Sequence, residues 1–587
     1  MPRKHRVVDH IVGYLATIGV DHVFGVDGAN IEDLYDAAYF QAGITAVLAK
    51  HEFGAATMAD GYSRSGAGLG VVAATSGGGA LNLVAGLGES LASRIPVLAL
   101  VGQPATTMDG RGSFQDTSGR NGALNAAALF SAVSVSCQRI LAAADIVAAL
   151  PRAISAARTG GPAVLLLPKN IQQDAVGSTG RGTNDGHGAR DVPPLPASVG
   201  DLHAIAQELR RAKGAVTIIA GEQVARDDAR AELEQLRAEL GALVATVPDA
   251  KDVAATSGFG SSCALGVTGV MGHPGVAEEL ATSAACLVIG TRLSMTARAG
   301  LEEALATVPT VSIGSAPPYL ACTHAHTDDL RGSLRLLTEA VRDRGGPAGP
   351  HGSAASRRTE LVPPPFAGPG LRYRDIMSAL DGALTDGDDI VVDAGNTGAS
   401  AVHYLPVRRG GRFAVALGMG GMGYSFGAGI GMAFGRANSG RPPARTVVVA
   451  GDGAFFMHGM EIHTAVHYRL PVTFVLLNNN AHAMCVTREQ LFYDDLYSYN
   501  RFRPSRLGAG LAAMFPGLSS ADVSDIEGFT AAVRAVRDVD GPAVVSVECA
   551  ADEIPPFAPF LTNDSATHVA TQNTSTIKEN RDVAARA

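Results

Sequence analysis

Two polar side chains, Asp452 and Asn479, follow two apolar runs whose patterns predict β-strands at 447–450 and 472–477, with a helical pattern between them. In an open parallel sheet the carboxyl ends of the strands meet at the edge where ligands bind, so we expect the two side chains to lie close together. Carboxylate and amide oxygens suit Mg²⁺, which can hold phosphate oxygens at the same time. The spacing therefore predicts a magnesium and phosphate site at this edge.

The turn around Asp452 has the composition of an anion-binding loop. Gly451 and Gly453 flank the aspartate, and the predicted helix follows at once. Glycines let the backbone approach a diphosphate, and a helix N-terminus attracts the negative charge. We therefore expect this turn to contact a diphosphate.

Length and composition describe a globular enzyme of several domains. The 587 residues predict about three or four domains, and a net charge of −9 gives no basic excess for nucleic acid. The six cysteines form no CxxC pair, which is typical of a reducing cytoplasm and argues against structural zinc. The start of the chain predicts an amphipathic helix rather than a signal peptide, and no apolar run reaches membrane-spanning length. We predict a cytoplasmic protein with no membrane partner.

An internal repeat relates two parts of the chain. Segment 70–103 aligns with segment 445–478, so that Arg94-x-Pro96 matches Arg469-x-Pro471. Any two strand–helix–strand units look alike, but the shared x-Pro-Val opening at equal distance favours a duplicated fold. The first copy has Gly77 and Pro104 where the second has Asp452 and Asn479, so only the second can bind the metal.

The second copy resembles a known cofactor signature. A Gly-Asp-Gly turn alone is common, but here 24 residues separate it from Asn478-Asn479, as in thiamine-diphosphate (ThDP) enzymes. The chain as a whole resembles the acetolactate (acetohydroxyacid) synthases of that class. The resemblance implies that ThDP and Mg²⁺ are the cofactors, and that the metal ligands are Asp452, Asn479 and the backbone carbonyl of Ala481.

The resemblance also implies the architecture: an α/β protein with three doubly wound parallel-sheet domains. We expect a pyrimidine-binding (Pyr) domain at 1–178, a middle domain at 196–345, a diphosphate-binding (PP) domain at 366–550, and a C-terminal arm and tail at 551–587. Segments rich in Gly and Pro at 172–200 and 345–365 are interpreted as linkers.

A candidate catalytic carboxylate lies in the first copy. The run from Lys50 through Glu52 to Ala56 resembles the RHE-x-x-A-A helix start of acetohydroxyacid synthases, in which the carboxylate hydrogen-bonds the aminopyrimidine and promotes ionisation at C2. The alternative is a structural Glu favoured by the helix dipole. The Gly-Asp-Gly signature favours catalysis, and the presence of Glu52 argues against the glyoxylate carboligase branch, which lacks it.

Other segments resemble further motifs of these enzymes. SFQDTSG at 113–119 would place Phe114 and Gln115 against the thiazolium side, and 418–431 would place the backbone of Met422 beside the aminopyrimidine. DAGNTG at 393–398 would contact the diphosphate. The implied cofactor contacts are Gly395, Asn396, Gly420, Met422, Gly451, Gly453, Ala454 and Met484.

Two alternative sites are disfavoured. The glycines of 418–423 match a dinucleotide fingerprint formally, but a poor first strand precedes them and no acidic residue follows at the required distance. His463 and His467 have helical spacing without an evident third ligand, so a helix-surface position is favoured over zinc.

The reaction type is inferred from the residues near the cofactor. ThDP decarboxylases have a pair of histidines at the position of Phe114 and Gln115 in this chain. In having Phe and Gln there, the chain resembles the carboligases. We expect a carboligase, a lyase or transferase that decarboxylates a 2-oxo acid, with pyruvate as the default donor, and adds the acyl anion equivalent to a second carbonyl. The alternatives are decarboxylation without ligation, acyl transfer to another nucleophile, and a non-catalytic ThDP-fold subunit.

Departures from the family pattern concern the acceptor. In the segment 290–296, Thr296 replaces the Arg that holds the second carboxylate, and Ser294 and Met295 replace aspartates near FAD. FAD binding is therefore doubtful, and the acceptor is expected to be an uncharged carbonyl unless Arg298 substitutes. His482 is unusual: it is either an acid/base or hydrogen-bonding group or a turn residue bonded to backbone.

The resemblance further implies assembly. Glu52 of one subunit should serve the ThDP held by its neighbour, which predicts an obligate homodimer, commonly doubled to a homotetramer.

Overall fold

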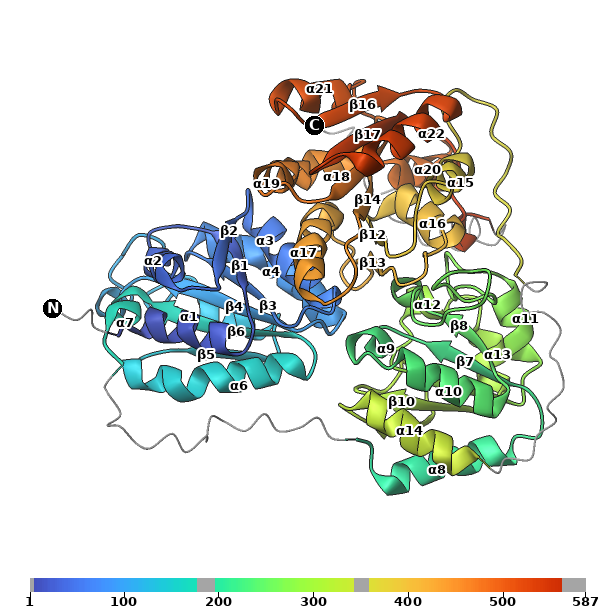
Figure 1. The fold of residues 1–587 in the computed structure, drawn as a ribbon, viewed down its shortest axis with the longest axis horizontal. Helices are drawn as coiled ribbons and strands as arrows, with labels where there is room; N and C mark the ends of the chain where they lie inside the picture. The colour runs from blue at the N-terminus through green and yellow to red at the C-terminus, as the bar shows by residue number, and fades with distance from the viewer. Residues whose placement is uncertain (1–4, 177–195, 343–357, 562–587) are drawn as a thin grey trace, which may run out of the picture.

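Each of the three lobes of the molecule is built on one parallel β-sheet (Figure 1). The computed structural model describes residues 5–176, 196–342 and 358–561. The predicted fold class, α/β with three doubly wound parallel-sheet domains, is confirmed. Each sheet lies within the range predicted for its domain, while the exact domain boundaries stay predictions. The core of the first predicted linker, most of the second, and residues 562–587 of the predicted arm and tail lie outside the described residues.

The Pyr domain contains a six-stranded sheet of order β2-β1-β3-β4-β6-β5. Its strands are β1 (His22–Val26), β2 (Thr45–Leu48), β3 (Gly70–Ala74), β4 (Val97–Gln103), β5 (Ser136–Arg139) and β6 (Pro162–Pro168). Its helices are α1 (Val7–Thr17), α2 (Glu32–Phe40), α3 (Glu52–Arg64), α4 (Gly78–Ala92), α5 (Ala126–Ser131), α6 (Ile146–Arg158) and α7 (Lys169–Gln173). The predicted amphipathic first helix is confirmed as α1, which buries one apolar face.

The PP domain repeats this topology, with the strand order β13-β12-β14-β15-β17-β16. Its strands are β12 (Asp389–Val392), β13 (Phe413–Val415), β14 (Thr446–Gly451), β15 (Val472–Asn478), β16 (Ser519–Val523) and β17 (Ala543–Glu548). Its helices are α15 (Tyr373–Asp381), α16 (Gly395–Tyr404), α17 (Tyr424–Asn438), α18 (Asp452–His458), α19 (Ile462–His467), α20 (Ala483–Phe492), α21 (Leu507–Met514) and α22 (Ile526–Ala535).

The duplication inferred from the sequence extends to backbone detail. Arg94 and Arg469, aligned in the repeat, both adopt positive φ angles, of 58° and 51°. Each begins the turn into the second strand of its unit. Non-glycine residues rarely adopt this conformation, so its recurrence at aligned positions supports a common origin of the two turns.

The single helix expected between β14 and β15 is broken. A 3₁₀ turn at Gly459–Glu461 separates α18 from α19. Glycine is a poor helix former, and a Cβ at Gly459 would lie 2.2 Å from the ring of Phe455. The turn directs Glu461 toward the Pyr domain, where it accepts hydrogen bonds from the backbone of Lys50 and His51.

The middle domain has a five-stranded sheet of order β11-β10-β9-β7-β8. Its strands are β7 (Val216–Ala220), β8 (Leu243–Thr246), β9 (Ala285–Ile289), β10 (Thr310–Gly314) and β11 (Thr323–His326). Its helices are α8 (Val199–Arg211), α9 (Gln223–Arg226), α10 (Arg230–Leu240), α11 (Gly275–Ala281), α12 (Met295–Arg298), α13 (Glu302–Thr307) and α14 (Leu330–Val341). Within the described residues, no helix has the length and apolar character that crossing a membrane requires.

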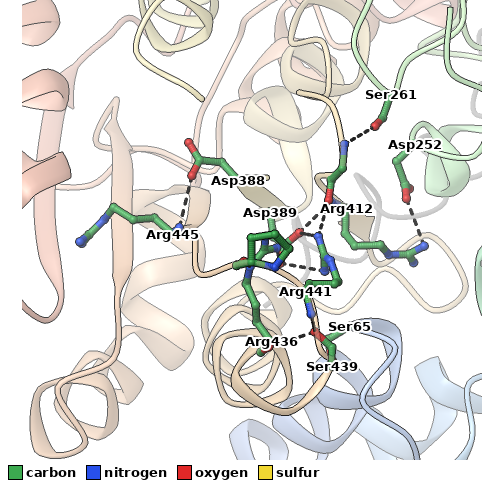
Figure 2. Close-up of polar contacts among 12 residues, drawn as sticks. Ser65, Asp252, Ser261, Asp388, Asp389, Arg412, Arg436, Ser439, Arg441 and Arg445 are labelled. Atoms are coloured by element: carbon green, nitrogen blue, oxygen red, sulfur yellow. Dashed lines mark hydrogen bonds and ion pairs between the residues drawn. The ribbon is translucent and has the colours of Figure 1, made fainter. Parts of the chain in front are cut away.

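Buried ion pairs join the middle and PP domains near the amino ends of the PP strands (Figure 2). Arg412 contacts Glu222 at 2.9 Å and Asp252 at 3.1 Å, across the domain boundary. Asp389, at the start of β12, binds Arg436 at 2.8 Å and Arg441 at 2.6 Å. Since each carboxylate has a guanidinium partner, the charges are compensated despite their burial.

Two stacked imidazoles occupy another part of the same boundary. The rings of His273, from the middle domain, and His403, from α16, lie 4.6 Å apart at an interplanar angle of 16°. Burial is the main cause that lowers the pKa of His273 to about 2 and that of His403 to about 4.

The histidine pair predicts acid sensitivity. The unfolded chain takes up a proton at each imidazole near pH 6.5 whereas the folded chain does not, so stability present above pH 6.5 is lost as the pH falls. We expect each histidine to cost about 2 kcal/mol of unfolding free energy between pH 6.5 and pH 5. Urea unfolding at both pH values should show a smaller loss in His403→Phe and an unchanged loss in the exposed control His203→Gln. An identical pH dependence in all three proteins would contradict this assignment.

Candidate active site

The carboxyl ends of β14 and β15 bring Asp452 and Asn479 together, as predicted. The two strands pair in parallel, with Gly451 opposite Leu477. Asp452 therefore begins α18 beside the end of β15, where Asn479 follows. The backbone N–H groups of Asn479 and Ala481 are close enough to lower the pKa of the Asp452 carboxyl in part. This turn is the centre of the candidate site.

Asp452 is a buried carboxylate without a hydrogen-bond partner. Its side chain is fully buried, and neither carboxylate oxygen forms a hydrogen bond of good geometry. Burial is the largest influence and raises its pKa to about 6, although nearby N–H groups oppose the shift. An uncompensated buried carboxylate is costly, so its presence requires an explanation such as a bound cation.

Asn479 is oriented by its own turn. Its Oδ1 accepts a hydrogen bond from the Ala481 N–H at 3.0 Å, and its Nδ2 donates to the Tyr373 hydroxyl at 3.3 Å. Asn480, between them, has a φ of 53°, which reverses the chain. The Asn479 side-chain oxygen and the Ala481 backbone thus lie on one turn. The resemblance requires this arrangement, because it implies that both residues are metal ligands.

The N-terminus of α16 lies beside the same turn. A Cβ at Gly451 would lie 3.5 Å from the Thr397 hydroxyl, which places α16 against the turn before Asp452. Asn396 is buried, and its Oδ1 has no hydrogen-bond partner. Gly395, the first residue of the helix, has a φ of 85° and open space where a side chain would be. The open helix N-terminus at Gly395 suits a bound diphosphate, whereas the Asn396 oxygen, an acceptor, would need a donor or a cation.

Met422 and His482 close over Gly453. A Cβ at Gly453 would lie 2.6 Å from His482 Nδ1 and 3.4 Å from Met422 Cε. His482 Nδ1 is buried without a partner, while the ring edge meets Phe502 at 4.7 Å between centroids. The sequence left two interpretations of His482 open, and in one of them its ring bonds to the backbone. The structure shows no such hydrogen bond for Nδ1. Ala454 is buried behind this turn, Met484 is half-buried in α20, and Gly420 is exposed in the loop before α17.

Glu52 begins α3 in the Pyr domain. His51 is the N-cap, and its ring nitrogen accepts a hydrogen bond from the Phe53 N–H. Glu52 is 9% exposed, and its Oε2 accepts a hydrogen bond from Asn82 at 2.9 Å. A Cβ at Gly79 would lie 2.9 Å from Oε1, so glycine leaves room for the carboxylate.

Gln115 lies near the same α4 N-terminus. It has a φ of 60°, and its Oε1 is 3.1 Å from the Ser76 hydroxyl. A Cβ at Gly77 would lie 2.8 Å from its Cγ. Its neighbour Phe114 is 76% exposed.

The predicted residues therefore form two groups. The metal and diphosphate group is assembled in the PP domain, and the group of Glu52 and Gln115 is assembled in the Pyr domain. Within the described residues, the hydrogen bonds of Glu52 and Gln115 stay inside the Pyr domain.

The sequence interpretation missed two residues that shape the PP group. Asp393, after β12, accepts hydrogen bonds from the N–H groups of Gly423 at 2.9 Å and Ser425 at 3.0 Å, and so holds the end of the Met422 loop. Tyr373, in α15, orients Asn479. Asp393 could have been found from the sequence, because it begins the segment 393–398 that resembles a family motif. Tyr373 could not, because it lies far from Asn479 in the chain and belongs to no recognised motif.

The residues present fit ThDP and Mg²⁺. Asp452, Asn479 and the Ala481 carbonyl would hold the metal, and the N-termini of α16 and α18 would hold the diphosphate. The unpartnered oxygens of Asp452 and the open space at Gly395 are the observations behind this fit.

The two alternative sites gain no support. No group of three His, Cys, Asp or Glu side chains suited to a metal occurs within the described ranges, and His463 and His467 are exposed on α19. In the loop 418–423, the N–H groups of residues 418–420 donate hydrogen bonds to the carboxylate of Glu89. A dinucleotide phosphate would need these N–H groups, so they are not available to it.

The altered segment 290–296, apart from residue 295, lines a cavity of about 520 Å³ where residues of the Pyr, middle and PP domains meet. Ser294 and Thr296 contribute to its wall, and their hydroxyls lie 2.9 Å apart. Arg298 instead donates to the Tyr319 carbonyl. The wall has a serine at 294 in place of an aspartate, and Met295 lies outside the wall. Doubtful FAD binding stays a prediction.

Comparison with known proteins matches all three domains. The thiamine pyrophosphate enzyme models match as N-terminal TPP binding domain at 5–123, central domain at 202–340 and C-terminal TPP binding domain at 393–547. The chain is 27% identical over 494 residues to a putative acetolactate synthase large subunit of Mycobacterium tuberculosis, covering 81% of this chain and 85% of that protein. It is 25% identical over 552 residues to the acetolactate synthase isozyme 2 large subunit of Escherichia coli, covering 92% and 94%. It is 26% identical over 574 residues to chloroplastic acetolactate synthase 3 of Brassica napus, covering 93% and 84%.

The Asp452→Ala variant tests the metal site. We expect it to fold and to bind Mg²⁺–ThDP at least 100-fold more weakly in calorimetry, because the metal loses its anionic ligand. Without cofactor, removal of a carboxylate whose pKa is raised to about 6 should stabilise the fold at pH 7 by about 2 to 3 kcal/mol. Asp329→Ala, which removes the N-cap of α14, is the control for a distant carboxylate. Unchanged cofactor affinity in Asp452→Ala would place the metal elsewhere.

Proposed function

The chain belongs to the thiamine pyrophosphate enzyme family, and we propose that within it the protein is a ThDP- and Mg²⁺-dependent carboligase. The donor is a 2-oxo acid, with pyruvate as the default, and the acyl group is joined to a second carbonyl compound. The observation that carries the proposal is the pairing of an intact Glu52 at the α3 N-terminus with an unpartnered, buried Asp452 at the PP turn.

Bound ThDP would supply the electron sink for the electron pair that decarboxylation leaves. Asp452, Asn479 and the Ala481 carbonyl would hold the Mg²⁺ that binds its diphosphate. Glu52 would share a proton with the aminopyrimidine through a carboxylate oxygen, which promotes ionisation at C2. Met422 would support the aminopyrimidine through its backbone.

Substrate handling falls to Gln115 and His482 in this proposal. Gln115 has an amide that can orient a carbonyl or carboxylate, and Phe114 beside it is exposed to contact an apolar group. His482 has a buried Nδ1 free to exchange a hydrogen bond with substrate. Because Thr296 replaces the expected Arg, we propose an uncharged aldehyde, ketone or diketone as acceptor.

The alternatives are separated by features of this chain. A simple decarboxylase or an acyltransferase shares the same cofactor machinery, so products must distinguish them. A non-catalytic subunit of this fold has no need of both Glu52 and Asp452, and their retention favours an enzyme.

Identification of products is the direct test. Purified protein with ThDP, Mg²⁺ and pyruvate should consume pyruvate and form a ligated product when an uncharged carbonyl acceptor is added. Glu52→Gln is the matched control, because an amide keeps the shape but cannot share the proton. Release of acetaldehyde in place of a ligated product would favour the decarboxylase, and full activity in Glu52→Gln would remove this carboxylate from the mechanism.

We also propose that the protein acts as a homodimer or homotetramer. Large apolar side chains are exposed beside both groups of site residues: Leu81 and Phe114 in the Pyr domain, and Phe456 and Met457 in α18. Exposed apolar clusters favour association. A second copy placed there would bring its Glu52 to the PP group of the first.

Mixing two inactive variants tests this arrangement. Glu52→Gln and Asp452→Ala chains, refolded or exchanged together, should regain up to one intact site per heterodimer, which is about half of the wild-type sites in that species. Each variant alone, carried through the same procedure, is the control. Full activity in a monomer, shown by light scattering at assay concentration, would contradict a shared site.

A further inference from the structure

Two buried glutamates lie where the Pyr and PP domains meet, outside the groups described as cofactor or metal ligands. Glu89 belongs to α4 of the Pyr domain and is 2% exposed; Glu461 ends the 3₁₀ turn of the PP domain and is 1% exposed. Each directs its carboxylate across the domain boundary. A buried carboxylate is retained only where hydrogen bonds compensate it, so its partners are informative.

Glu461 binds the turn that carries Glu52. Its Oε1 accepts hydrogen bonds from the N–H groups of Lys50 at 2.9 Å and His51 at 3.0 Å. Its Oε2 accepts a hydrogen bond from the Thr464 hydroxyl at 2.9 Å. Lys50 and His51 directly precede Glu52, so this contact fixes the backbone from which the catalytic candidate extends.

Glu89 binds the loop that carries Met422. Its Oε1 accepts a hydrogen bond from the Gly418 N–H at 3.0 Å, and its Oε2 accepts hydrogen bonds from Met419 at 2.6 Å and Gly420 at 3.3 Å. The Ser93 hydroxyl also donates to Oε1, at 2.8 Å. Three consecutive N–H groups on one carboxylate define the start of this loop.

Glycines make both approaches feasible. A Cβ at Gly54 would lie 2.3 Å from Glu461 Oε1, and a Cβ at Gly418 would lie 3.0 Å from Glu89 Oε1. A side chain at Gly54 would displace the carboxylate from the α3 turn. The two contacts therefore depend on small residues placed opposite each glutamate.

We propose that Glu461 and Glu89 form a reciprocal clamp within one chain, in which each domain positions a loop of the other. In the proposed dimer, the Met422 loop acts on the aminopyrimidine bound by its own chain, and Glu52 acts on the one bound by the neighbouring chain. Both are positioning residues: Glu461 acts through Glu52, and Glu89 acts through Met422. The proposal rests on the proposed function only in that Glu52 activates ThDP and Met422 supports it. It goes beyond that function because it assigns the residues that fix the turn before Glu52 and the Met422 loop relative to each other.

A purely structural role is the competing explanation. Arg412 and Glu222 also bridge domains, yet they bind at the amino ends of the PP strands, away from the cofactor loops. The clamp glutamates instead bind backbone within two residues of Glu52 and within four residues of Met422. Removal of either should therefore change cofactor activation and not only stability.

Amide substitution distinguishes the two glutamates. In Glu461→Gln, Oε1 still accepts from both N–H groups, and the new NH₂ can donate to the Thr464 hydroxyl, which is also an acceptor. In Glu89→Gln, both oxygens already accept from N–H groups, so either orientation of the amide sets an NH₂ against an N–H group. The same substitution should thus preserve the contact at 461 and break it at 89.

The experiment measures exchange of the C2 proton of bound ThDP with deuterium, by rapid quench and proton NMR, in full-length protein with saturating Mg²⁺–ThDP. We expect Glu461→Ala, Glu89→Ala and Glu89→Gln to slow exchange at least tenfold, and Glu461→Gln to stay within threefold of wild type. In steady-state kinetics, the first three should lower kcat more than they change KM. Asp525→Ala, which removes the N-cap of α22, is the control for lost stability alone.

The outcomes separate the clamp from the proposed function. Loss of exchange in Glu52→Gln with all four clamp variants within threefold of wild type would overturn the clamp and leave the function standing. The clamp is also overturned if Asp525→Ala slows exchange as much as Glu461→Ala, or if the two Gln variants behave alike. Unchanged exchange in Glu52→Gln would instead contradict the assigned role of Glu52, and with it the premise of the clamp.

Discussion

The arrangement of the active-site loops depends on the close packing of α3 against α17, which joins the Pyr and PP domains (Figure 1). A Cβ at Gly61 would lie 2.0 Å from the Ala428 carbonyl oxygen, and a Cβ at Gly431 would lie 1.8 Å from the Met58 carbonyl oxygen. Backbones can meet at this distance only without side chains between them, because protein interiors leave little space to absorb a misfit. Glu52 begins α3 and the Met422 loop leads into α17, so the helix contact sets where both begin.

The duplicated fold explains why one scaffold can serve two roles. Both copies present a strand end, a turn and a helix N-terminus at equivalent places. In the Pyr copy the turn carries Gly77, which leaves space that Gln115 fills; in the PP copy it carries Asp452, which remains without a partner. A few residues at the strand ends thus make the two turns different. The Pyr turn packs against its own side chains, and the PP turn can hold a cation.

The sequence predicted the elements with strong periodicity and the residues with local signals. Strands β14 and β15 and helix α3 lie where expected, and the Asp452 turn followed from chain order alone, because parallel strands place their carboxyl ends at one edge. The break between α18 and α19 was missed, since it depends on Glu461 turning toward a domain about 400 residues away in the chain. Tyr373, Glu89 and Glu461 were missed for the same reason: each acts through contacts remote in sequence, and no spacing rule reports them.

Buried charge separates the structural end of the PP domain from its functional end. Near the amino ends of the strands, Asp388, Asp389 and Asp252 each bind at least one arginine, as compensated interior charges do. Near the carboxyl ends, Asp452 is equally buried, yet neither of its carboxylate oxygens has a partner. A fold does not retain such groups for stability, because an unsatisfied buried oxygen costs more than an apolar replacement. The imbalance is therefore best explained by a ligand, and a buried carboxylate without a partner at the N-terminus of α18 suits a divalent cation bound together with a diphosphate.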